Sequence, residues 1–198
     1  MNRVILGLLV LVALFPAGCK KATPKELFQV AENRSMQADR VLDSLRAAGG
    51  DVNALLQPVI DAYETVVKEY PESQEAEHSL HSIATILNNG MRQPEKAVVA
   101  YKRYVEVFPN GPQAANAMFL TGFIYNNELH NLDSARAAYA RFLNRFPQSE
   151  LASSALFELQ NLGKSPEELF PQGSPQEEPP ATAQQKHKSR LPAGSKTL

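Results

Sequence analysis

The chain has 198 residues and a formal net charge of −1, so it lacks the basic excess that nucleic-acid binding usually requires. Its apolar content of 43% and charged content of 21% are ordinary for a globular protein, and the length suffices for one domain with appendages. A single cysteine excludes an internal disulfide and a metal site built from several thiolates.

The first segment has the pattern of an export signal. Arg3 precedes an apolar run, Val4 to Phe15, which is too short to cross a membrane because a spanning helix needs about 20 residues. The only cysteine, Cys19, follows the small residues Ala17 and Gly18, where cleavage is expected. The alternative is an ordinary export signal with an incidental cysteine.

Helical patterns follow in chain order. A first helix is expected over residues 24–47, because apolar residues recur on one face and Gly49-Gly50 stops it. A second begins at Asp51 and runs to Tyr70, with a kink or break at Pro58. Further helices are expected over residues 73–88, 94–108, 112–128, 132–146 and 149–162.

An aromatic residue followed by proline recurs every 38 residues, at Tyr70-Pro71, Phe108-Pro109 and Phe146-Pro147. The helix before each pair carries the same apolar stripe, which places Tyr101 and Tyr139 in equivalent buried sites. A second helical pattern follows each proline. Helix pairs repeating at a period of about 20 to 50 residues indicate a solenoid.

These spacings resemble the tetratricopeptide repeat. In that family the second helix carries a small residue, an aromatic residue four positions later and a proline twelve positions after the small residue. The residues that keep this spacing are Ala97, Tyr101 and Pro109, and Ala135, Tyr139 and Pro147. The resemblance covers residues 51–163. It implies an all-α solenoid of helical hairpins with a final capping helix.

The aromatic-proline ends and the 38-residue period also resemble the repeats of periplasmic lipoproteins, such as the outer-membrane barrel-assembly lipoprotein and the Tol-Pal-associated cell-division coordinator. The residues before Cys19 resemble a lipobox, except that Pro16 stands where leucine is usual. In that family the cysteine is acylated and becomes the first residue. Lys20 after it implies the periplasmic face of the outer membrane rather than the inner membrane.

We therefore expect four parts: a lipoprotein signal peptide over residues 1–18, a lipid-anchored tether over 19–24, a repeat domain over 25–170 and a tail over 171–198. The tail is rich in proline and poor in large aliphatic residues. It cannot bury enough apolar area to offset the entropy of ordering, so we expect it to be disordered.

No pattern for catalysis, a cofactor or a phosphate loop is present, so we expect no enzymatic activity and no cofactor. His78 and His81 would share a helix face, but no third metal ligand follows at a suitable offset, and we expect no metal. His81 instead aligns with Phe119 and Phe157, which indicates a surface or groove position for a side chain of aromatic size.

In tetratricopeptide repeats the first helix of each pair lines the concave surface. The resemblance assigns to this groove His81, Asn116, Phe119, Phe123, Asn126, Asn127 and Phe157. Phenylalanine offers apolar contact, and asparagine can both donate to and accept from a peptide backbone. The alternative is that the phenylalanines pack against neighbouring helices and the asparagines are ordinary helix-end residues.

The sequence thus predicts a non-catalytic scaffold that docks a protein partner of the cell envelope in its groove, during envelope or outer-membrane biogenesis. The lipid on Cys19 would hold it to the membrane, and no nucleic acid and no small-molecule substrate are expected. The alternatives are a structural spacer between membrane and cell wall, and an accessory subunit of an envelope enzyme or transport complex.

Overall fold

The computed structural model describes residues 21–164 and Glu168. The helices of this part are α1 (Pro24–Ala47), α2 (Val52–Glu69), α3 (Gln74–Thr85), the π-helical turn η1 (Ile86–Gly90), α4 (Pro94–Val107), α5 (Ala114–Asn127), α6 (Leu132–Arg145) and α7 (Ala152–Gln160), and it contains no strand. The expected signal peptide, Cys19 and the expected tail lie outside the described residues.

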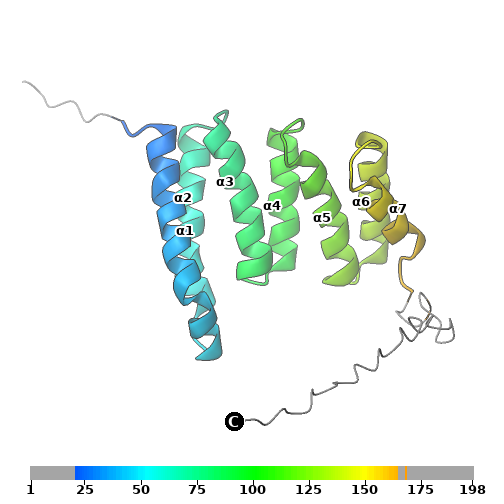
Figure 1. Cartoon of the computed structure of the whole chain (residues 1–198), viewed down its shortest axis with the longest axis horizontal. Coiled ribbons are helices and arrows are strands. Elements are labelled where there is room, and N and C mark those ends of the chain that lie inside the picture. The colour runs from blue at the N-terminus through cyan, green and yellow to red at the C-terminus, as the bar shows by residue number, and fades with distance from the viewer. Residues whose placement is uncertain (1–20, 165–167, 169–198) are drawn as a thin grey trace, which may run out of the picture. The chain divides into compact units, whose positions relative to one another are not determined.

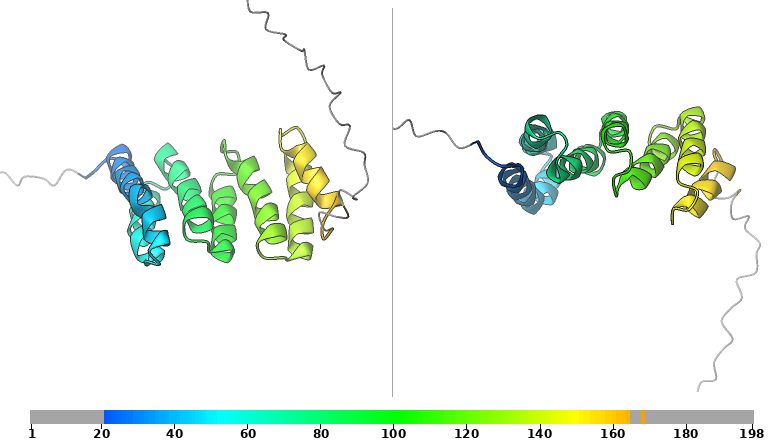
Figure 2. Two further views of the ribbon diagram at one scale, coloured as in Figure 1. Left: turned by 60° about the horizontal axis from the view of Figure 1, so that its bottom comes forward. Right: turned by 90° about the horizontal axis from the view of Figure 1, so that it is seen from above.

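The helices form an all-α solenoid of tetratricopeptide-like hairpins, which confirms the predicted fold class. Within the compact unit that ends at Leu162, successive helices stand side by side and reverse direction at each short connection (Figures 1 and 2). Each of α2 to α6 packs against the helix before it and the helix after it, and α7 packs against α6. The hairpins are α1–α2, α3–α4 and α5–α6.

The ends of α1 and the start of α2 follow local rules. Thr23 and Glu26 form a capping box at the start of α1. Gly49 has a φ of +70°, and this left-handed conformation ends α1 just before it. Asp51 caps α2 by accepting from the Ala54 N–H at 3.0 Å. At Pro58, where a kink or break is expected, the helix does not break, because α2 continues through this residue as one helix.

The aromatic-proline pairs end their helices in the same way each time. Tyr70, Phe108 and Phe146 are the C-terminal caps of α2, α4 and α6. Each N–H donates to the carbonyl four residues earlier, at 2.9, 2.8 and 2.8 Å, and each carbonyl accepts from the N–H three residues later, at 3.0, 3.1 and 3.1 Å. The 38-residue period is therefore a period of backbone geometry.

The turns inside the hairpins also repeat. Arg92 and His130 are 38 residues apart, and both take positive φ, 54° and 50°. The next residue donates its N–H across the turn in each case, from Gln93 to the Leu87 carbonyl and from Asn131 to the Tyr125 carbonyl, both at 2.8 Å. Arginine gave no sequence signal for this left-handed conformation, which favours glycine and, among other residues, asparagine, aspartate and histidine.

Equivalent tyrosines hold the core together. Tyr101 and Tyr139 are 2% and 0% exposed, as predicted, and Tyr63 is buried in the same place of α2. Gly122 of α5 makes room for Tyr139: a Cβ at this glycine would lie 2.8 Å from the tyrosine ring. Small residues in one helix therefore let an aromatic residue of the next helix seat beside its backbone.

Candidate functional site

The residues predicted to line the groove share one side of their helices. His81, Thr85 and Asn89 of the α3–α4 hairpin occupy the places that Phe119, Phe123 and Asn127 occupy one period later. Because four residues make about one turn, each set forms a row along its helix. We call this side of α3, α5 and α7 the first-helix face.

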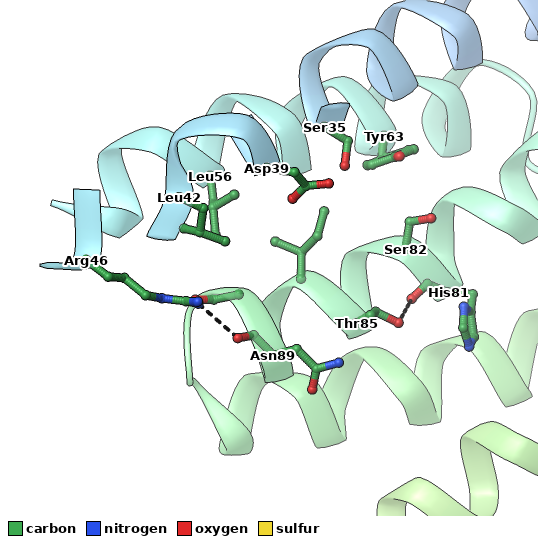
Figure 3. A pocket seen from close by; sticks show the side chains of 12 residues that line it. Ser35, Asp39, Leu42, Arg46, Leu56, Tyr63, His81, Ser82, Thr85 and Asn89 are labelled. Carbon is green, nitrogen blue, oxygen red and sulfur yellow. Dashed lines mark hydrogen bonds between the residues drawn. The ribbon is translucent and has the colours of Figure 1, made fainter. Parts of the chain in front are cut away.

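The first-helix face carries a cleft where α3 approaches α1 (Figure 3). Its volume is about 470 Å³. Side chains from three helices line it: Ser35, Asp39 and Leu42 of α1, Leu56 and Tyr63 of α2, and His81, Ser82 and Thr85 of α3. Apolar and hydrogen-bonding groups thus alternate along one hollow, which suits a peptide chain.

Arg46 closes one end of this cleft. Its guanidinium donates to the carbonyl of Gly90 at 2.6 Å and to that of Asn89 at 3.1 Å, the second bond being visible in Figure 3. These two carbonyls belong to the last residues of η1, and the last carbonyls of a helix have no partner within it. The contact ties the end of α1 to the end of the next hairpin's first helix.

Among the residues that line the cleft, Tyr63 and His81 have shifted pKa values. The Tyr63 hydroxyl donates to the Glu32 carboxylate, and burial together with this carboxylate raises the pKa of Tyr63 to about 12. Burial, together with the charge of His78, lowers the pKa of His81. The buried His81 Nε2 has no hydrogen-bond partner among the described residues. His81 is therefore held in its neutral form near pH 7, with an unused nitrogen.

His81 and Phe119 play the same packing role one period apart. The His81 ring lies edge-on to Tyr101 and Tyr104, with centroids 6.1 and 6.0 Å away. Phe119 contacts the equivalent rings of Tyr139 and Phe142, at 5.8 and 6.0 Å. Both side chains are half-buried. Phe119 therefore packs mainly against the neighbouring helix, as the alternative interpretation of the phenylalanines expects.

Phe123 and Phe157 are placed differently. Phe123 is 37% exposed and Phe157 is 51% exposed, among the large apolar side chains that the described part of the chain leaves uncovered. Phe157 occupies the position of His81 and Phe119, but α7 is followed by no second helix in residues 161–164 that would cover it. Phe123 has neighbours on both sides along the solenoid and is still exposed.

The asparagines fall into two groups. Asn126 joins α5 to α7, because its side-chain N–H donates to the Glu158 carboxylate at 3.2 Å. Asn127 donates to the Phe123 carbonyl of its own helix at 3.1 Å, and Asn116 donates to the Gln113 side chain at 3.4 Å. Asn126 is thus a bridge between helices, and the other two make local contacts near helix ends.

The sequence pattern did not predict that the buried hydroxyl of Tyr139 lacks a hydrogen-bond partner among the described residues. Burial raises the pKa of Tyr101, and a hydrogen bond with the Thr85 side chain partly lowers it. One period later Phe123 stands in the place of Thr85 and offers no hydrogen-bonding group. The Tyr139 hydroxyl accordingly has no partner among the described residues, and burial, with the charge of Glu158, raises its pKa strongly.

In the part of the chain that the structure describes, no three His, Cys, Asp or Glu side chains gather as metal ligands would. The helices of residues 21–164 include none that combines the length and the apolar character needed to cross a bilayer.

Comparison with known families agrees with this geometry. The family model described as tetratricopeptide repeat matches residues 116–149, which hold most of α5, all of α6 and the turn at Phe146-Pro147. No curated protein matches the chain. The fold and the match define a tetratricopeptide-like repeat protein, a class that typically binds other proteins and is typically not catalytic.

Proposed function

We propose that this protein is a non-catalytic scaffold of the bacterial cell envelope that holds a segment of a partner protein on its first-helix face. A lipid on Cys19 anchors it to the periplasmic side of the outer membrane. The observation that carries the binding proposal is Phe123: it is a large aromatic side chain, 37% exposed in the middle of the solenoid, on the side that bears the α1–α3 cleft. Exposed aromatic side chains of this kind commonly mark interaction sites.

The chemistry of the face suits an extended or helical peptide. Phe123 offers an apolar contact, and the exposed Asn127 amide lies one turn along the same row of α5. An apolar side chain of the partner would lie against the phenylalanine while its backbone amides bond the polar groups. Phe119 contributes packing beneath this surface rather than a free ring.

Capture of a partner by Phe123→Ala tests this proposal. The variant is expected to keep the fold, because the side chain is partly exposed, and to weaken capture of an envelope partner at least about tenfold. Val99→Ala is the matched control, since Val99 is a 67% exposed apolar residue of α4. Equal capture by Phe123→Ala and wild type contradicts the proposal. Unfolding of Phe123→Ala assigns the side chain to the core instead.

The anchor is tested separately. Intact mass of membrane-purified protein is expected to show a chain that begins at Cys19 and carries acyl groups, and Cys19→Ser is expected to leave the membrane fraction. A chain that lacks residues 1–18 but carries no acyl mass contradicts the anchor. Retention of Cys19→Ser in the membrane fraction does so as well.

Loss of capture only when residues 171–198 are removed would favour the spacer alternative.

A further inference from the structure

Two successive clefts open between second helices of the hairpins. The first, about 370 Å³, lies between α2 and α4, and the second, about 250 Å³, lies between α4 and α6. Residues 38 positions apart line both: Glu64 and Lys102, Leu80 and Met118, Ile83 and Thr121, Ala100 and Ala138, and Arg103 and Arg141. The two clefts are therefore one structural feature in consecutive repeats, and their differences can be compared directly.

These clefts are separate from the first-helix face. Leu80 and Ile83 line the first of them, whereas His81 and Thr85 line the α1–α3 cleft. With 3.6 residues per turn, or about 100° per residue, these two pairs point to opposite sides of α3. An inference about the second cleft therefore does not depend on the function proposed for the first-helix face.

The clefts differ in charge. In the first, the Arg103 guanidinium pairs with the Glu64 carboxylate and so joins α4 to α2. In the second, Lys102 replaces the glutamate while Arg141 keeps the arginine, so two cations face a hollow where the first repeat has an ion pair. Arg145 lines the same hollow. We call this feature, lined by Lys102, Val105, Met118, Thr121, Ala138, Arg141 and Arg145, the basic cleft.

None of the three cations is paired with a carboxylate in the described part of the chain. Lys102 donates to the Tyr125 hydroxyl at 2.9 Å, with its ammonium 5.1 Å from the centre of that ring. Arg141 donates to the Ala137 carbonyl of its own helix, and Arg145 donates to the Pro109 carbonyl at 2.7 Å. Neutral oxygens thus accept from these N–H groups, and no carboxylate of the described residues forms an ion pair with the three cations.

We propose that the basic cleft binds an acidic segment of a partner protein, with an apolar side chain next to its carboxylates. Charge complementarity favours carboxylates beside Lys102 and Arg141, where they restore the balance that Glu64 gives the first cleft. The floor of the hollow is apolar, with Val105, Met118 and Ala138, and it admits one aliphatic or aromatic side chain. A concave site of this size suits a protruding side chain better than the surface of a membrane.

Selection from short random peptides displayed on phage tests the proposal, with the full chain purified in detergent as the target. Recovered peptides are expected to carry aspartate or glutamate beside a large apolar residue. Lys102→Glu gives the basic cleft the glutamate-arginine pair of the first cleft, and it is expected to weaken the binding of these peptides at least about tenfold. The affinity for wild type is also expected to fall as salt is raised.

The reverse exchange is the matched control. Glu64→Lys gives the first cleft the lysine-arginine pair of the basic cleft, so the same peptides are expected to gain a second site on that variant. Circular dichroism of both variants is expected to match wild type, because all the substituted charges lie at the surface or partly exposed.

Three results overturn the proposal. The first is recovery of peptides without acidic enrichment, or of none. The second is equal affinity of the acidic peptides for wild type and Lys102→Glu. If these peptides instead lose affinity for Phe123→Ala, they bind at the first-helix face. The third is a result in which no acidic peptide is recovered, but Cys19→Ser protein binds phosphatidylglycerol vesicles and loses this binding when Lys102→Glu is added. This last result assigns the cleft to anionic lipid.

Discussion

Removing the unpartnered hydroxyl of Tyr139 is expected to stabilise the protein. The side chain is 0% exposed, and its hydroxyl has lost the partner that Thr85 provides to Tyr101 one period earlier. Leaving a buried polar group without a hydrogen bond costs about 1–3 kcal/mol. Tyr139→Phe removes that cost and keeps the ring that packs against Gly122 and Phe119.

The two phenylalanine substitutions are expected to have opposite signs. Tyr139→Phe is expected to raise the free energy of unfolding by about 1 kcal/mol, the low end of the range, because the missing oxygen also removes some packing contacts. Tyr101→Phe loses the Thr85 hydrogen bond and is expected to lower the free energy of unfolding by about 1 kcal/mol. In a chain of this size each change corresponds to a shift of about 2–4 °C in Tm.

Urea unfolding followed by circular dichroism measures both variants against wild type. Their m-values are expected to agree, so that a change in midpoint reports a change in stability. The reasoning is refuted if Tyr139→Phe is destabilised as much as Tyr101→Phe, because the Tyr139 hydroxyl must then make a hydrogen bond of equal value.

Four further outcomes follow from the same structure. Tyr101→Ala and Tyr139→Ala are each expected to lower the free energy of unfolding by about 3–5 kcal/mol in urea, and unchanged stability of either refutes the repeat alignment. Gly122→Ala is expected to cost about 1–3 kcal/mol, because the new Cβ lies 2.8 Å from the Tyr139 ring; a thermal midpoint equal to wild type argues against that contact. His130→Gly is expected to gain about 1 kcal/mol at its φ of 50°, and a loss shows that histidine is not strained there. Removing residues 171–198 is expected to leave Tm unaltered, whereas a large drop means that this segment packs on the solenoid.

The helix ends were predictable because local chemistry decides them. Phe108-Pro109 and Phe146-Pro147 stop their helices by proline's missing N–H, and Gly49 stops α1 by its left-handed conformation. The expected starts were less accurate: α7 begins at Ala152 rather than at residue 149, and the Ser149 side chain accepts from the Leu151 N–H in the preceding turn. Local signals thus give the elements, but neighbouring turns shift their boundaries.

The π-helical turn η1 could not be predicted. Its sequence, Ile86–Gly90, closely resembles residues 124–128, which are α-helical up to Asn127. The difference comes from distant contacts: a Cβ at Gly90 would lie 2.8 Å from the Leu56 side chain, and Arg46 holds the Gly90 carbonyl. Both contacts come from the first hairpin, so a window of sequence around η1 does not contain the cause.

The candidate site was only partly readable from the sequence. The period correctly put His81 and Phe119 in equivalent places, where each packs against two rings of the following helix. It did not predict exposure, which is 51% for Phe157. The exchange of Glu64 for Lys102 was visible at the 38-residue offset. The consequence of this exchange required the structure, because only the ion pair shows that Glu64 of α2 faces Arg103 of α4.

The central claim is that a partner protein contacts the first-helix face at Phe123. Its most direct test replaces Phe123 with the photo-crosslinking residue benzoylphenylalanine in living cells, with the same replacement at Val99 as the control. We expect a discrete crosslinked protein of the cell envelope from position 123 and none of that protein from position 99. No crosslink from position 123, or the same products from both positions, would contradict it.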